Sequence, residues 1–509
     1  MISKTKALLI KHWLLVYSLL VAALILLFCS KSSPLYPMND WVDVHCFLTL
    51  GKGLLNGLIP YVDLYEQKGP VLYFIYAIVA IFCDKSMIGQ YLLEVITFGL
   101  FLYFSGKIAE VYLGKSQFRY MIIAILGAVV ATTQSFSHGG SVEQMCLFLF
   151  VYGLYSVIRA CHENRPLSFR EALTNGIFAG VAFWIKYTMA GFYLGLALFV
   201  LIWYTGWIRD WKKLLTVMGQ FLLGVAAVSA VVVVFYLLVG GLDELYTCYF
   251  YNNIILYPTE SDVPKLVQIW NSFTGAMQRN SIFPILLYLG LGWLAIRIHK
   301  CIRDLIATVL SFTGLVIGTY MGAGYLYYGL VLSAFSVFGL IALVWVLKLI
   351  LSETVLGSIR TNDRTVNAIL ITAILFLSSV WAFNNSSNTY LMAYNRDEMP
   401  QYQFAGIIRE TEDATVLNFG FLDGGFYYAA DVLPNCTFFC SFNINAPGMW
   451  DTHYEYIREG KVDYVITRRR RLEDYHVDSS QYELVDISSL YFEGIDFPYY
   501  LYRLKGVNQ

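Results

Sequence analysis

Charged residues are scarce in this chain. Asp, Glu, Lys and Arg make up 14% of its 509 residues, whereas an ordinary soluble domain carries about 25%. Hydrophobic residues make up 58%, and they occur in blocks close to the roughly 20 residues that cross a bilayer as a helix. The composition excludes a soluble globular protein and predicts a polytopic α-helical membrane protein.

Several motifs of soluble chemistry are also missing. The nine cysteines form no CxxC pair and show no Cys/His zinc spacing. The sequence has no GxGxxG, Walker, GxSxG or HExxH motif, so soluble nucleotide chemistry has no support. The net charge of −1 argues neither for nor against nucleic acid, and we see no basic patch with interleaved aromatic residues, so we expect no nucleic-acid partner.

Basic residues between the apolar blocks predict the topology. Cytoplasmic loops are enriched in Lys and Arg, and the basic stretches here are the N-terminus (Lys4, Lys6 and Lys11) and residues 107–119, 159–170, 209–213, 297–303 and 348–364. Placing all of them inside gives about 11 transmembrane helices, a cytoplasmic N-terminus and an extracytoplasmic C-terminus.

The predicted spans leave two segments outside the membrane. The spans are residues 11–29, 87–106, 120–133, 145–158, two within 176–208, 214–239, 282–296, 305–320, 326–347 and 366–382. The apolar segment 70–83 is predicted to be a helix at the outer surface, because a span there puts the later basic loops outside. Residues 240–280 are predicted to form a long external loop.

The composition becomes that of a soluble domain after residue 384. Strands are predicted at residues 415–419, 437–441, 464–467, 482–486 and 499–504, with helices at 401–409 and 450–458. We therefore expect a transmembrane module over residues 1–384, with its first external loop at 30–86, and an extracytoplasmic α/β domain over residues 385–509.

The first external loop is rich in acids. It holds Asp40, Asp43 and Asp63 among Gly, Pro and aromatic residues. Asp43 is a candidate general base, since a carboxylate can take the proton of an attacking hydroxyl; the alternative is that Asp40 and Asp43 cap the next helix. Asp63 and Lys68 are candidate substrate contacts, because Lys can hold a phosphate as a point charge; the alternative is an interfacial turn.

Other candidates lie at the predicted outer ends of later helices. Glu143 and His138 share a short external loop, where Glu143 can act as a second acid or as a helix-start carboxylate. Lys186 is a candidate phosphate contact, because charges within apolar spans usually face a cavity or a partner. Tyr325 and Tyr328 can line a sugar or prenyl-phosphate site or belong to an aromatic belt.

The stretch Gly53-Leu-Leu-Asn-Gly57-Leu-Ile-Pro60-Tyr61-Val-Asp63, followed by Lys68-Gly69-Pro70, resembles the GT-C superfamily in its protein-mannosyltransferase-like and aminoarabinose-transferase-like branch. The resemblance covers residues 10–350. It implies transfer of a sugar, with inversion and outside the cytoplasm, from a polyprenyl-phosphate donor to a glycan, lipid or protein acceptor. It implies that Asp43 is the base and that a juxtamembrane helix follows Lys68-Gly69-Pro70.

The chain departs from this family at two places. Some branches carry adjacent Asp-Glu in the first loop, where this chain has Asp43-Val44-His45, and others have Lys-Pro-Pro where it has Lys68-Gly69-Pro70. The sugar and the metal dependence therefore do not carry over. No cofactor is required by this interpretation, and a divalent cation held by Asp43 and Glu143 stays open.

Two other functions remain as alternatives. One is a transporter or flippase for a lipid-linked glycan, and the other is a glycan polymerase or ligase. Transporters often show paired repeats with broken helices, and we find no such symmetry. The acidic external loop and the soluble external domain favour a glycosyltransferase.

The topology predicts where a reporter fused after Gln509 is active. An alkaline phosphatase fusion is expected to be active and a fluorescent-protein fusion dark, because the parity of the basic loops puts the C-terminus outside. Matched fusions after Lys300, in a predicted cytoplasmic loop, should give the opposite pattern. A fluorescent fusion after Gln509 would contradict the topology.

Overall fold

The computed structural model describes residues 12–83, 86–256, 263–322, 324–352, 364–444, 446–492 and 495–507. The chain forms two compact units, one of residues 1–30, 91–230 and 259–389 and the other of residues 31–90, 231–258 and 390–509. This division differs from the predicted boundary at residue 384, because the first loop groups with the C-terminal domain. The predicted basic residues Lys4, Lys6 and Lys11, and residues 353–363 of the basic stretch 348–364, lie outside the described residues.

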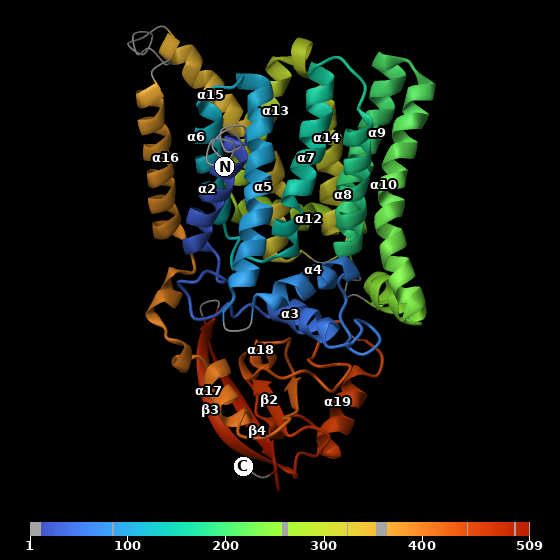
Figure 1. Ribbon diagram of the computed structural model, residues 1–509, viewed down its shortest axis with the longest axis vertical. Helices are drawn as coiled ribbons and strands as arrows, with labels where there is room; N and C mark the ends of the chain where they lie inside the picture. The colour runs from blue at the N-terminus through green and yellow to red at the C-terminus, as the bar shows by residue number, and fades with distance from the viewer. Residues whose placement is uncertain are drawn as a thin grey trace, which may run out of the picture. The chain divides into compact units, whose positions relative to one another are not determined.

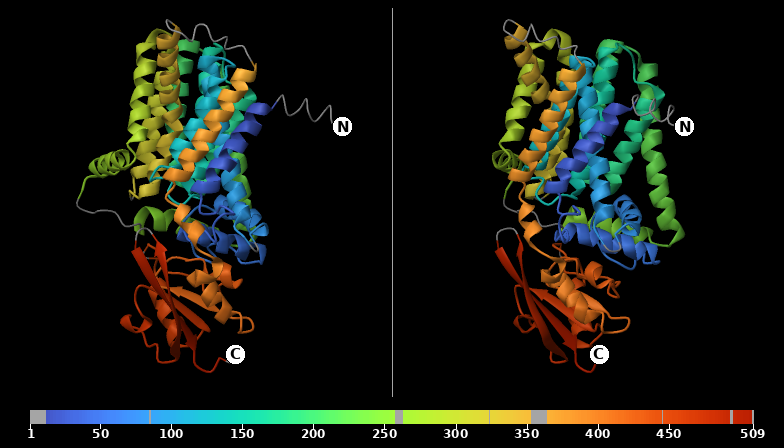
Figure 2. Two further views of the ribbon diagram at one scale, coloured as in Figure 1. Left: turned by 90° about the vertical axis from the view of Figure 1, so that its left-hand side faces the viewer. Right: turned by 60° about the vertical axis from the view of Figure 1, so that its left-hand side comes forward.

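Most helices of the first unit are long and apolar and run side by side, whereas α12 (Lys265–Arg279) lies across them (Figure 1, Figure 2). Each predicted span falls on an observed helix. The helices are α2 (Trp13–Cys29), most of α5 (Ile88–Leu113), α6 (Phe118–Ala131), α7 (Val142–His162), α8 (Phe169–Ile185), α9 (Ala190–Trp203), most of α10 (Trp211–Leu238), α12 (Lys265–Arg279), α13 (Ile282–Ile296), α14 (Ile298–Tyr320), α15 (Ser336–Ser352) and α16 (Arg364–Asn385). Shorter turns are η1 (Tyr187–Met189), η2 (Tyr204–Ile208) and η4 (Leu326–Phe335).

Many of these helices are suited to a bilayer. Within the described residues, seven helices are long and apolar enough to cross a membrane, and the count rises to eight if the bent pair of α12 and α13, which meet at 102°, is one span. The predicted polytopic α-helical fold is therefore confirmed. The predicted long loop at residues 240–280 is instead largely helical, with α11 (Leu242–Leu245), the π-helix η3 (Tyr246–Leu256) and α12.

Glycines bring α9 and α14 into backbone contact. A Cβ added to Gly191 would lie 2.2 Å from the carbonyl oxygen of Gly314, and one added to Gly195 would lie 2.1 Å from that of Leu310. Small residues four apart let helices approach closely in lipid, where packing replaces the hydrophobic effect as the driving force. This contact fixes the distance between the two helices.

The second unit begins with two helices from the predicted first loop. These are α3 (Val42–Leu55) and α4 (Pro70–Ile81), and Pro70 opens α4 at a position where its missing N–H costs nothing. With 12 residues, α4 is only about 18 Å long and is too short for a hydrocarbon core of about 30 Å. This agrees with the prediction that residues 70–83 form a helix without spanning.

The C-terminal part of this unit is a four-stranded sheet in the order β1-β2-β4-β3. β1 and β2 are parallel, and the other neighbouring strands are antiparallel. The elements are β1 (Val416–Phe419), β2 (Tyr464–Arg468), β3 (Tyr482–Phe492), β4 (Ile495–Leu504), α17 (Pro400–Ile408), α18 (Phe426–Ala430) and α19 (Met449–Arg458), with short 3-10 turns η6 (Thr389–Ala393), η7 (Arg396–Glu398) and η8 (Leu472–Asp474). The predicted small α/β domain is confirmed.

One predicted strand is wrong. Residues 437–441 form no strand, and only Cys440 makes a single bridge, to Asn418. The backbone of this segment is used elsewhere, since the Thr437 carbonyl accepts a hydrogen bond from the Tyr65 N–H at 2.8 Å. Residues 437–441 therefore connect the C-terminal part of this unit to the first loop through a backbone hydrogen bond.

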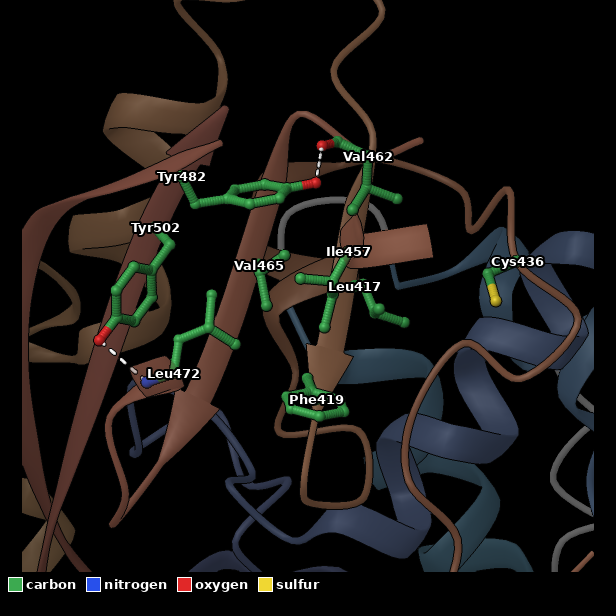
Figure 3. Close-up of a cluster of buried hydrophobic side chains, with 9 residues drawn as sticks. All are labelled: Leu417, Phe419, Cys436, Ile457, Val462, Val465, Leu472, Tyr482 and Tyr502. Atoms are coloured by element: carbon green, nitrogen blue, oxygen red, sulfur yellow. Dashed lines mark hydrogen bonds between the residues drawn. The ribbon is translucent and has the colours of Figure 1, made fainter. Parts of the chain in front are cut away.

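The core of the domain lies between the sheet and α19 (Figure 3). Two tyrosines satisfy their hydroxyl groups there: Tyr482 donates to the Val462 carbonyl at 2.7 Å, and Tyr502 accepts from the Leu472 N–H at 3.0 Å. The buried residues of this core are Leu417, Phe419, Cys436, Ile457, Val462, Val465, Leu472, Tyr482 and Tyr502. These bonds allow aromatic rings with polar ends to fill the core without leaving orphaned groups.

A buried carboxylate fastens α3 to the sheet. Asp423 accepts hydrogen bonds from the Thr49 hydroxyl (2.6 Å), the Asn418 amide (3.1 Å) and the Gly425 N–H (2.9 Å). Its burial raises the pKa of this carboxyl to about 6 in spite of the three donors. Asp423 therefore holds α3 in place, and because its pKa is raised, the charge of this carboxyl depends on pH.

This raised pKa predicts a pH-dependent loss of stability. The folded state holds the proton of Asp423 more tightly than the unfolded chain, so the stabilisation is complete below about pH 4 and is lost as the pH rises through about 6, a change of roughly 3 kcal/mol. In Asp423→Asn the fall in melting temperature that this group causes between about pH 4 and about pH 7 should disappear. Identical pH profiles of the melting temperature for the variant and the wild type would contradict this role.

Candidate functional site

The candidate base Asp43 lies in the first turn of α3 and is half-buried. The N-cap is Trp41, whose side chain makes no capping bond, and its N–H instead donates to the Asn39 side chain at 3.0 Å. The alternative that Asp40 and Asp43 cap this helix is therefore wrong. A carboxylate in the first turn is stabilised in its ionised form by the helix dipole, and this is the form that accepts a proton.

The neighbouring Asp40 has a different environment. Its Oδ1 is 2.5 Å from the Lys31 ammonium, and both side chains are buried. Close by, the His45 ring bonds the Asn39 carbonyl, and burial lowers the pKa of His45 to about 4, so the imidazole is neutral near pH 7. Asp40 and His45 thus shape the start of α3, whereas Asp43 projects from its first turn.

Glu66 organises the segment that carries Lys68. Its Oε2 accepts a hydrogen bond from the Lys68 N–H at 2.6 Å and another from the Tyr73 hydroxyl. The Lys68 carbonyl accepts from Tyr73 at 2.9 Å and also from the Tyr61 hydroxyl. The sequence shows Glu66 only as one more acid in the loop, because its partners Tyr61 and Tyr73 meet it through the fold. The half-buried Lys68 is thereby held just before the start of α4.

The Asp63 carboxylate closes a turn. Its Oδ2 accepts a hydrogen bond from the Ile59 N–H at 2.6 Å. Within the same turn Tyr61 has a φ of 72°, a left-handed conformation that is uncommon for a residue with a side chain. The structure places Asp63 where it shapes the Pro60–Lys68 segment, and a contact of Asp63 with substrate stays a prediction.

In the first unit the structure brings Glu143, Lys186 and Tyr328 together. The Lys186 ammonium is 2.7 Å from Glu143 Oε1 and lies 3.4 Å from the centroid of the Tyr328 ring. The Glu143 side chain is 1% exposed, and among the described residues its Oε2 has no hydrogen-bond partner. Glu143 is also in the first turn of α7, as the helix-start alternative predicts, and its role as a second acid stays a prediction. The site therefore pairs a buried cation with a buried carboxylate, one oxygen of which has no hydrogen-bond partner among the described residues.

Two other predicted residues lie near the ends of the same helices. His138 is buried, and its Nε2 is 3.5 Å from the Ser137 hydroxyl, just before the left-handed Gly139 and Gly140. Tyr325 is 37% exposed and meets Tyr328 edge to face, with ring centroids 5.5 Å apart. Tyr328 is therefore the tyrosine that contacts the ion pair, and Tyr325 is the outer one.

Sequence reasoning missed a pocket of about 300 Å³ in this unit. It contains one arginine, Arg279, at the bend between α12 and α13. The other lining residues are Val129, Thr132, Thr133, Gln134, Asn280, Ser281, Ile282, Trp381 and Asn385. A guanidinium among hydroxyl and amide groups suits an anion. The bend between α12 and α13 positions Arg279, and the sequence did not reveal this bend because residues 240–280 were predicted to be a loop.

The predicted site residues divide between the two units. Asp43, Asp63 and Lys68 belong to the second, and the others belong to the first. Among the described residues no group of three or more His, Cys, Asp or Glu side chains could hold a metal ion.

The comparisons place the fold among solved membrane enzymes. No protein-family model and no curated protein sequence matches the chain. The structure is similar to ArnT from Cupriavidus metallidurans bound to undecaprenyl phosphate, with a TM-score of 0.60 and 14% identity over 96% of this chain and 98% of that one. It is also similar to the archaeal oligosaccharyltransferase AglB from Archaeoglobus fulgidus in complex with an inhibitory peptide and a dolichol-phosphate, with a TM-score of 0.53 and 13% identity over 90% of this chain and 70% of that one.

These likenesses extend over nearly the whole chain and include both the helices and the C-terminal domain. They agree with the resemblance carried by the first loop and its Lys68-Gly69-Pro70 motif. The chain has the fold of the GT-C membrane glycosyltransferases.

Proposed function

We propose that the chain is a glycosyltransferase that takes a sugar from a polyprenyl-phosphate donor and transfers it to an acceptor outside the cytoplasm. The observation that carries this proposal is the likeness over 96% of the chain to a structure bound to undecaprenyl phosphate. The second similar structure holds a dolichol-phosphate, which is also a polyprenyl phosphate. The acidic first turn of α3 supplies a candidate base for the chemistry.

The proposed reaction is a single displacement at the anomeric carbon. The acceptor hydroxyl attacks this carbon while Asp43 takes its proton, and the bond from the carbon to the donor phosphate oxygen breaks. Polyprenyl phosphate leaves with the bonding electrons, and attack from the opposite side inverts the configuration. General-base assistance of this kind contributes about 100- to 10,000-fold in rate.

Asp43 is preferred as base because the GT-C resemblance of the first loop gives this role to its position, and each of the other acids considered has a structural contact. Asp40 is paired with Lys31, Asp63 closes its turn, and Glu66 holds Lys68 and Tyr73. Asp43 is half-buried at a helix start, where its ionised form is favoured.

Three cations are candidates for the donor phosphate. Lys68 precedes α4, whose N-terminal dipole adds to its attraction for an anion. Arg279 lines the pocket of about 300 Å³, and a guanidinium can bind phosphate oxygens in pairs. The Lys186 ammonium forms an ion pair with Glu143, so a donor phosphate would compete with this buried carboxylate for Lys186. We propose Glu143 Oε2, which has no hydrogen-bond partner among the described residues, as an acceptor for a sugar hydroxyl.

Replacing the base tests the proposal directly. In Asp43→Asn the transfer rate is expected to fall about 100- to 10,000-fold, measured as release of free polyprenyl phosphate from a panel of polyprenyl-phosphate sugars with purified protein in lipid. Asp451→Asn is a matched control, because Asp451 is also in the first turn of a helix, α19, and is exposed. Normal turnover by Asp43→Asn would exclude Asp43 as base.

The ion pair predicts an effect on stability that must be separated from donor binding. Lys186→Met leaves the buried Glu143 carboxylate without its counter-charge, which costs about 3 to 5 kcal/mol, and adding Glu143→Gln should restore most of the melting temperature. A donor KM about tenfold higher in this double variant than in Glu143→Gln alone, with an unchanged acceptor KM, supports a phosphate contact by Lys186, since tenfold is about 1.4 kcal/mol. Equal changes in both KM values would leave Lys186 a structural role only.

A further inference from the structure

Four consecutive arginines, Arg468–Arg471, begin at the end of β2 and form the turn after it. Two other arginines of this domain have carboxylate partners: Arg503 is 2.8 Å from Glu483, and Arg458 is 3.4 Å from Glu459. Among the residues that the structure describes, Arg468–Arg471 make no ion pair within 4.0 Å. The turn therefore gathers four positive charges that no carboxylate compensates by contact.

The backbone of this turn is fixed. The Thr467 hydroxyl, which is fully buried, donates to the Arg470 carbonyl at 2.7 Å. The Arg469 N–H donates to the Pro498 carbonyl of β4 at 2.8 Å. Hydrogen bonds at both places hold the arginines in one arrangement, in contrast to a flexible basic tail.

Aromatic rings from distant segments orient the guanidinium groups. Arg468 lies 5.1 Å from the Phe421 ring centroid and 5.3 Å from that of Phe497, and Arg469 lies 4.1 Å from the Phe497 centroid. Arg471 lies 5.7 Å from the Tyr500 centroid. Cation–π contacts of this kind hold guanidinium groups against ring faces, so the surface presents oriented donors beside apolar planes.

The position of this surface in the sheet is also one where ligands bind. β1 and β2 are parallel, and the arginines follow the carboxyl end of β2 while Phe421 follows that of β1. In α/β sheets the space beyond the carboxyl ends of parallel strands is the usual place for a ligand. The N-terminal part of β4, with Phe497, completes this edge.

We propose that Arg468–Arg471, with Phe421, Phe497 and Tyr500, bind the acceptor, and that the acceptor is an anionic glycan carrying phosphate or carboxylate groups. Guanidinium groups recognise these oxyanions through paired hydrogen bonds, and the ring faces offer apolar surface to sugar rings. The identification of the ligand as the acceptor rests on the proposed function, whereas the binding itself does not.

A glycan fits this surface better than an anionic membrane does. Basic clusters that bind lipid head groups usually lie next to a transmembrane helix or along an amphipathic helix. Here the arginines lie in a fixed turn at a sheet edge, and their guanidinium groups are packed on rings. Such an arrangement favours a ligand with defined spacing between its charges.

The test is binding of glycans to the full chain in phosphatidylcholine nanodiscs. The probes are an oligoglucuronate, a poly(glycerol phosphate) and neutral dextran, offered without any donor. We expect binding of at least one anionic probe, none of dextran, and a rise in Kd of about tenfold or more in Arg469→Ala/Arg470→Ala/Arg471→Ala, which is about 1.4 kcal/mol or more. The single variant Arg470→Gln, which alters one exposed side chain, should raise the Kd less and guards against misfolding of the triple variant.

The matched control is Arg458→Ala/Arg503→Ala, which removes two arginines that have carboxylate partners in the same domain. Its Kd should stay within twofold of the wild type. Equal binding by the triple variant and the control would overturn the proposal. So would binding that appears only when the nanodiscs contain phosphatidylglycerol, since this would identify a lipid surface.

Failure of this inference can be told apart from failure of the proposed function. An Asp43→Asn protein should keep its affinity for the anionic probe, because the binding is read without donor or turnover. Transfer of sugar by a wild type that binds none of the anionic probes would overturn the acceptor assignment and leave the glycosyltransferase intact. Probe binding that is lost only in the arginine variants supports the assignment even where no donor is turned over.

Discussion

A charge buried among apolar residues needs an opposite charge or hydrogen-bond donors beside it, and three carboxylates of this protein have such partners. Lys31 neutralises Asp40 beside the start of α3, Lys186 neutralises Glu143 at the start of α7, and three donors surround Asp423. An uncompensated ion in a low-dielectric interior costs several kcal/mol. The backbone around each of these groups is therefore constrained by its partners, and α3 in particular is fastened at both its beginning and its middle.

The same partners give most acids of the first loop a structural role. Asp40, Asp63 and Glu66 each have one oxygen bound to a cation, an amide or a hydroxyl of the fold. Asp43 lies in the first turn of α3, and Glu143, like Asp40, has one oxygen without a hydrogen-bond partner among the described residues. Tyr61 and Tyr73 add rigidity by binding the carbonyl of Lys68, so that the cation precedes a fixed helix start.

The sequence predicted the helices well, because long apolar blocks separated by basic stretches leave few alternatives in a bilayer. It also predicted β1, β2, β3 and β4 and the resemblance carried by the first loop. It failed for two segments: the Thr437 carbonyl binds the Tyr65 N–H where a strand was predicted, and the described parts of residues 240–280 are largely helical. The rings around Arg468–Arg471 come from Phe421 and from β4, so no local pattern of basic and aromatic residues could reveal that surface.

The glycine contact between α9 and α14 has a mechanical consequence. Because Gly191 and Gly195 touch the backbone of the opposite helix, no side chain at this contact can change rotamer to let the two helices slide or separate. Glycines bring α8 and α10, and also α13 and α15, into the same kind of backbone contact. When the thickness or lateral pressure of the bilayer changes, the spacing within these three helix pairs is therefore preserved, and the change is taken up where side chains separate the helices.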